Sequence, residues 1–91
     1  MKVLKCIITD ESGIHARPAG RLAALAKGFT KTKIFIEREE KRADAERLFM
    51  LMALGVRCGD SVSFIIEGAY EDAALTALSE FLSGELSYEI L

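Results

Sequence analysis

The spacing of apolar residues along this chain alternates between the two-residue repeat of a β-strand and the three-to-four-residue repeat of an α-helix. Residues 2–9 place Leu4, Cys6 and Ile8 on one side of a predicted strand. Residues 61–66 alternate in a similar way. Strands of this kind have one apolar face, which predicts a sheet that is covered on a single side.

Two segments have the apolar spacing of amphipathic helices. Ala16–Lys27 is the first; Pro18 is tolerated in its opening turn, and Gly28 follows as a stop signal. Tyr70–Ser83 is the second, and Gly84 is expected to end it.

The middle of the chain predicts shorter elements. Lys33–Arg38 contains the run Ile-Phe-Ile, and the charged residues 37–42 offer a polar turn toward a short second strand. That turn lacks the Asn-Gly or Asp-Gly pair of a tight hairpin. Asp44 is expected to cap a short helix over Glu46–Leu54, with the acidic Glu46 in the positive first turn.

The predicted order is βαββαβα, which has too few separated strands for a doubly wound parallel fold. We therefore expect one α+β domain over residues 1–91, with a sheet and helices packed on one of its faces. A chain of 91 residues, 51% of them hydrophobic, can form one core without a metal or a disulfide. Cys6 and Cys58 lack the paired spacing of a zinc or redox site, so two reduced thiols are expected.

Charge and hydropathy exclude several classes of partner. Twelve basic and fourteen acidic residues give a net charge of −2 without a basic stripe, so no nucleic-acid partner is expected. Lys2 and Lys5 interrupt the apolar start of the chain, and no small-residue cleavage site follows. We expect neither a signal peptide nor membrane insertion, and a cytoplasmic location.

The residues that carry chemistry gather at Gly13–Pro18, where the predicted first helix begins. His15 is the only histidine, and a helix N-terminus offers unpaired N–H groups and a positive dipole to an anion. That environment disfavours the imidazolium form and leaves a ring nitrogen free to attack phosphorus. The guanidinium of Arg17 can pair with phosphate oxygens. The candidate catalytic residues are His15 and Arg17, and the candidate phosphate-binding residues are Ser12, His15, Ala16 and Arg17.

A lone histidine near a helix start is more often a surface cap than a nucleophile, so position alone is weak support. The sequence offers no second histidine, metal-binding cluster, Ser-His-Asp set or Walker-type glycine loop. No cofactor or metal is therefore expected, and protein partners must supply the rest of any reaction.

Three segments carry a resemblance to a known family. GIHARPAG, at residues 13–20, resembles the active-site signature of the HPr phosphocarriers of the bacterial sugar phosphotransferase system. LAKGFTK, at 25–31, is similar to the end of that family's first helix, and ERLFMLMALGVRCGD, at 46–60, to its second helix and the following turn. The similarity covers nearly the whole chain.

The resemblance implies an open-faced sandwich, with a four-stranded antiparallel sheet and three helices on one face. It also implies that His15 accepts a phosphoryl group on Nδ1 from the phosphohistidine of enzyme I and passes it to a histidine of enzyme IIA, with Arg17 beside it. Each transfer would take place across a transient interface between proteins. No free-standing turnover is then expected, and the protein is expected to be a monomer.

The resemblance also implies a docking surface for these partners. Its apolar part would be Leu48, Phe49 and Met52 on the short helix, although Met52 fits the core equally well by spacing. Leu51 and Leu54 are better core candidates. Arg21 and Lys27 would steer acidic partners, while Ala24 and Met50 stand where relatives carry lysines.

Arg47 stands where Gram-positive relatives carry a regulatory serine at the start of the second helix. An arginine cannot be phosphorylated by a serine kinase, so this switch is not expected here. Ser12, Ser61 and Ser63 do not replace it. The segment EREEKR, at 37–42, also lacks the glycine that is usual in this turn.

Two alternatives to a general carrier for sugar uptake remain open from the sequence. One is a paralogue that serves a nitrogen-related or dedicated relay, including a kinase that uses phosphohistidine instead of ATP. The other is a regulatory binding module, which is favoured when the histidine is replaced. Here His15 and Arg17 are both intact.

Overall fold

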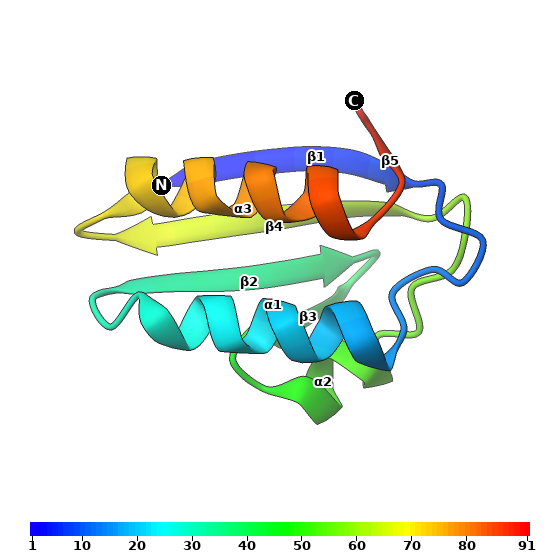
Figure 1. Ribbon diagram of the computed structural model, residues 1–91, viewed down its shortest axis with the longest axis horizontal. Helices are drawn as coiled ribbons and strands as arrows, with labels where there is room; N and C mark the ends of the chain where they lie inside the picture. The colour runs from blue at the N-terminus through cyan, green and yellow to red at the C-terminus, as the bar shows by residue number, and fades with distance from the viewer.

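The computed structural model describes residues 1–91 as one sheet with three helices (Figure 1). None of the helices is both long enough and apolar enough to cross a membrane. The elements in chain order are β1 (Lys2–Ile8), α1 (Ala16–Gly28), β2 (Thr32–Arg38), β3 (Lys41–Asp44), α2 (Leu48–Ala53), β4 (Ser61–Gly68), α3 (Glu71–Glu85) and β5 (Tyr88–Ile90).

The sheet has the strand order β3-β2-β4-β1-β5, and every neighbouring pair is antiparallel. Phe64 of β4 lies at its centre, opposite Leu4 on one side and Ile36 on the other. Phe64 and Ile36 are completely buried, and Leu4 packs against the core. The two-residue repeat therefore places one apolar row of each strand under the helices, as predicted.

The helices cover one face of the sheet, with α1 and α3 side by side and α2 next to α1 (Figure 1). Leu22 of α1 and both Leu78 and Leu82 of α3 are almost completely buried in this layer. Burial of a leucine side chain contributes roughly 1.5–3 kcal/mol, so these faces hold the helices to the sheet. The α+β architecture with helices on one side is confirmed.

The sheet has five strands, so the expectation of four was wrong. Gly84 does not end α3, because the helix continues to Glu85 and the N–H of Leu86 still donates to Leu82 at 3.0 Å. Leu86 is buried, and this burial outweighs the roughly 1 kcal/mol that a helical glycine costs. Residues 88–90 then pair with the free edge of β1. A three-residue strand is too short to produce a recognisable periodic pattern.

The short helix α2 also begins later than expected. Asp44 is the last residue of β3, and its carboxylate accepts the N–H of Glu46 at 3.0 Å instead of capping a helix. Glu46 lies before α2 and pairs with Lys33 at 2.6 Å. The turn between β2 and β3 has no glycine, and Glu39 adopts the left-handed backbone conformation there, with φ of 56°.

The two cysteines lie in contrasting environments. Cys6 is completely buried in β1, and this burial raises the pKa of its thiol to about 11. Cys58 is exposed, and its Sγ lies 3.5 Å from the carbonyl oxygen of Thr9. Neither forms a disulfide.

At mildly alkaline pH, a thiol-specific reagent should label about one cysteine per native chain and about two per chain unfolded in denaturant. Only the thiolate reacts, and in the native chain Cys6 is buried. Counting the labelled thiols by mass spectrometry of the intact protein checks this. The variant Cys58→Ser should lose the fast reaction entirely. Fast labelling of Cys6 in the folded protein would contradict the burial of β1.

Candidate functional site

His15 is the residue at which the chain enters α1. Its backbone is extended, with φ of −106° and ψ of 179°, and its carbonyl accepts the first helical hydrogen bond, from the N–H of Ala19 at 3.0 Å. The side chain makes no capping hydrogen bond and is exposed. The imidazole ring is therefore free to react with a group that approaches from outside.

Two backbone N–H groups next to His15 have no acceptor within the chain. They belong to Ala16 and Arg17, and the next residue, Pro18, has no N–H. No acidic residue lies in the first turn to neutralise the positive end of the dipole. The start of α1 can therefore donate hydrogen bonds to an anion carried by His15.

The backbone before His15 is packed tightly against the segment that follows α2. Gly13 has φ of 62°, and a Cβ added to it would lie 2.2 Å from the carbonyl oxygen of Val56. That same oxygen accepts the N–H of Ile14 at 3.2 Å. Glycine is required here both for the backbone conformation and for the close approach.

The segment that supports Gly13 is itself held in place by a carboxylate. Asp60 accepts the backbone N–H of Arg57 at 2.8 Å and pairs with Arg38 at 2.8 Å. Arg38 also donates to the carbonyl of Leu54, next to the end of α2, at 3.3 Å. The hydrogen bond from the Arg57 N–H, more than the charge of Arg38, lowers the pKa of Asp60. These hydrogen bonds and the ion pair therefore connect residues 54–60 to the end of β2.

The expected basic residues differ in whether their charge is free. Arg17 and Lys27 are exposed and make no ion pair within the chain. Arg21, in contrast, pairs with Glu85 at the end of α3. This pairing partly neutralises its positive charge. Ser12 is exposed, and its N–H donates to Asp10 at 3.1 Å.

The short helix α2 lies beside α1 (Figure 1), and several of its apolar side chains are exposed. Phe49 is 87% exposed, and Leu48 and Met52 are 38% and 39% exposed. Leu51 and Leu54 are buried in the core, as predicted. Met52, which the sequence left open between core and surface, therefore lies at the surface with Phe49.

The fold brings Arg57, which no sequence pattern marks, next to the segment that carries the histidine. A Cβ on Gly13 would lie 2.8 Å from the Cα of Arg57. Arg57 is exposed and makes no ion pair. It occupies a polar turn remote in sequence from His15, and no local pattern marks such a residue as part of the site.

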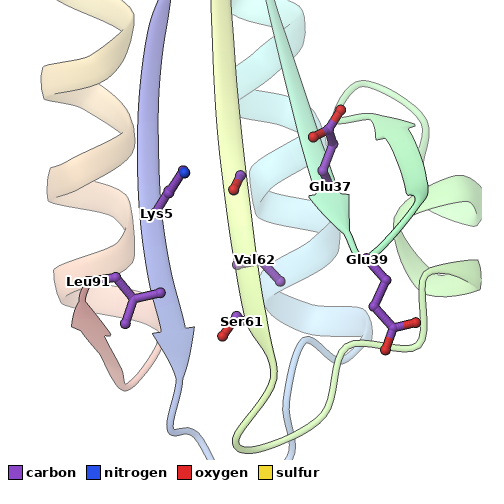
Figure 2. Close-up of a pocket in the computed structure, with 7 residues that line it drawn as sticks. Lys5, Glu37, Glu39, Ser61, Val62 and Leu91 are labelled. Atoms are coloured by element: carbon purple, nitrogen blue, oxygen red, sulfur yellow. The ribbon is translucent and has the colours of Figure 1, made fainter.

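The main hollows of the surface lie away from His15. Figure 2 shows one on the face of the sheet that the helices leave open, lined by residues of mixed charge that include Lys5, Glu37 and Glu39. No group of three or more His, Cys, Asp or Glu residues could hold a metal ion. His15 therefore lies on an open surface that a protein partner can reach.

Comparison with known proteins agrees with this arrangement. Residues 4–84 match the family model described as the PTS HPr component phosphorylation site. The phosphocarrier protein HPr of Lysinibacillus sphaericus is 36% identical over 83 residues, which cover 91% of this chain and 93% of that protein.

A second relative is a longer protein, the PEP-dependent dihydroxyacetone kinase phosphoryl donor subunit DhaM of Providencia stuartii. It is 38% identical over 74 residues, which cover 81% of this chain and only 15% of that protein. Among solved structures, the histidine-containing phosphocarrier protein of Mycoplasma superposes with a TM-score of 0.87 at 30% identity, covering 91% of this chain and 93% of that one. On the family match, the relatives and the shared fold, this chain belongs to the HPr family of phosphocarrier proteins.

Proposed function

We propose that His15 accepts a phosphoryl group from the phosphohistidine of enzyme I and passes it to a histidine of enzyme IIA in sugar uptake. The observation that carries this proposal is the exposed His15 ring at the start of α1, beside the two unpaired N–H groups of Ala16 and Arg17. The protein acts as a monomer in the cytoplasm, a reducing compartment in which Cys6 and Cys58 remain thiols.

The transfer exchanges one phosphorus–nitrogen bond for another. A ring nitrogen of His15 attacks the phosphorus, the bond to the donor's imidazole breaks, and the electron pair of that bond remains on the donor. The N–H groups of Ala16 and Arg17 and the Arg17 guanidinium bind the phosphoryl oxygens during the exchange. Because the bonds broken and formed are of the same type, the step can run in either direction, as a carrier requires.

The exposed part of α2 supplies the apolar contact with the partner. Phe49, Leu48 and Met52 belong to its exposed apolar surface. Arg17 and Lys27 are positive charges without an ion pair on the neighbouring helix. An apolar centre with a charged rim is the usual composition of a transient interface. Partners with an acidic rim around their own histidine fit this surface best.

A dedicated relay is the second candidate function. The relative from Providencia stuartii is described as the phosphoryl donor subunit of a PEP-dependent kinase, and a segment of it matches 81% of this chain. The chemistry at His15 would be the same, with a different acceptor. Transfer rates measured from the phosphorylated protein to separate acceptors distinguish the two functions.

With enzyme I and phosphoenolpyruvate, we expect the wild-type protein to gain one phosphoryl group that is labile to acid and stable to base. The variant His15→Ala should gain none, because the chain has no other histidine. Radiolabelling followed by acid and base treatment checks this. A wild-type protein that stays unlabelled with several different enzymes I would contradict the carrier function.

The variant Arg17→Glu should slow phosphoryl transfer by about a hundredfold, because it replaces a donor to the phosphoryl oxygens by a negative charge. Its free energy of unfolding should change by no more than about 0.5 kcal/mol, because Arg17 is exposed and unpaired. Rapid-quench transfer assays and denaturant unfolding measure the two effects. Lys31→Glu, which makes the same charge change beyond the other end of α1, is the control. Equal losses of stability and transfer would overturn the assignment of Arg17.

The variant Phe49→Ala should raise the KM for phosphorylated enzyme I about tenfold, as expected for a central aromatic contact at an interface. Its stability should be almost unchanged, because Phe49 is 87% exposed. Steady-state phosphorylation kinetics give the KM. Tyr70→Ala removes another exposed aromatic side chain, just before α3, and should leave the KM at the wild-type value. Identical KM values for the two variants would show that α2 is not the docking surface.

A further inference from the structure

Arg57 lies on the segment after α2, directly against the backbone that leads to His15. The Cα of Arg57 would be 2.8 Å from a Cβ on Gly13, and the preceding carbonyl, of Val56, accepts the N–H of Ile14 at 3.2 Å. These contacts fix the position of the Arg57 backbone relative to the histidine. Gly13 has no side chain that would hold the Arg57 backbone away from the segment before His15.

The Arg57 side chain is long enough to reach a group on His15. His15 is two residues after Gly13, and two residues of fully extended chain span at most about 7 Å. An extended arginine side chain covers a similar length. A guanidinium on Arg57 can therefore approach the surface around the His15 ring, from a different element than Arg17.

The charge of Arg57 is also available. The neighbouring carboxylate of Asp60 is already paired with Arg38 and accepts the Arg57 backbone N–H, whereas the Arg57 guanidinium makes no ion pair and the residue is exposed. Arg21, the other arginine expected near the site, is paired with Glu85. Arg17 and Arg57 thus carry two unpaired guanidinium groups on the two segments that adjoin His15.

We propose that Arg57 is a second phosphate-binding residue, which donates hydrogen bonds to the phosphoryl oxygens on phosphorylated His15 together with Arg17. This inference rests on the proposed carrier function of the same site. A phosphoryl group presents three strong acceptor oxygens, more than one guanidinium can satisfy through its planar fork. The second guanidinium retains the phosphoryl group between the two transfers.

The retention has a physical cause. Loss of the phosphoryl group to water breaks the bond between the imidazole nitrogen and the phosphorus. A guanidinium that is hydrogen-bonded to the phosphoryl oxygens holds them in place and stabilises the phosphorylated state. Removal of the guanidinium should therefore make phosphorylated His15 shorter-lived.

The experiment uses potassium phosphoramidate, a small chemical donor of phosphoryl groups to histidine, so that no enzyme I is needed. The His15 nitrogen takes the phosphoryl group from phosphoramidate, and ammonia is the leaving group. The loss of phosphate from the isolated phosphorylated protein is then followed in wild type, Arg57→Ser, Arg57→Lys and Lys31→Ser. Lys31 is the matched control, because it is an exposed cation without an ion pair beyond the far end of α1.

We expect Arg57→Ser to lose its phosphoryl group about fivefold faster than wild type, and Arg57→Lys to lie between them, because lysine keeps the charge but not the planar fork. Lys31→Ser should match wild type. Thermal unfolding should show all variants folded, since the Arg57→Ser backbone N–H can still donate to Asp60. The proposal is overturned if the lifetimes of phosphorylated Arg57→Ser and Lys31→Ser agree within about twofold. A difference that small is well under the effect of one charge-assisted hydrogen bond.

The outcome is independent of the partner proteins. A short lifetime in Arg57→Ser together with no labelling of wild type by enzyme I would support the phosphate-binding role of Arg57 and refute the carrier function. Normal labelling of wild type by enzyme I, together with an unchanged lifetime in Arg57→Ser, would support the carrier function and refute the phosphate-binding role of Arg57.

Discussion

The contact between Gly13 and Val56 is the constraint on which the site depends. Only a residue without a side chain allows the Val56 carbonyl to come close enough for the hydrogen bond from Ile14 at 3.2 Å. This contact joins the segment before α1, which carries His15, to the segment after α2. Asp60 and Arg38 join the segment after α2 to β2. The position of His15 is therefore set by the sheet together with α1 and α2.

The chemistry of the site follows from what this arrangement leaves unsatisfied. The N–H groups of Ala16 and Arg17 have no acceptor, and the Arg17 guanidinium has no carboxylate partner. An anion on His15 would satisfy these donors at once. No pocket and no metal-binding cluster lies at the site, and the proposed function assigns its completion to an approaching protein. The exposed apolar surface of α2, next to α1, is where the proposal places that protein.

Much of the fold could be predicted from periodicity, because the buried rows of β1 and β4 and the buried faces of α1 and α3 depend on local spacing. The errors arose where tertiary contacts overrode local signals. Gly84 remained helical because Leu86 is buried beyond it, and Asp44 ended a strand because β3 pairs with β2. The fifth strand was missed because three residues carry no detectable repeat.

The sequence by itself determined the candidate reactive group. His15, Arg17 and Gly13 are close together in the chain, so their chemistry and their place at a helix start can be inferred from order alone. Only the tertiary structure decided which charges remain free around that group. The pairing of Arg21 with Glu85 and the approach of Arg57 to Gly13 join residues 64 and 44 positions apart, and a linear pattern does not encode the packing that brings such residues together.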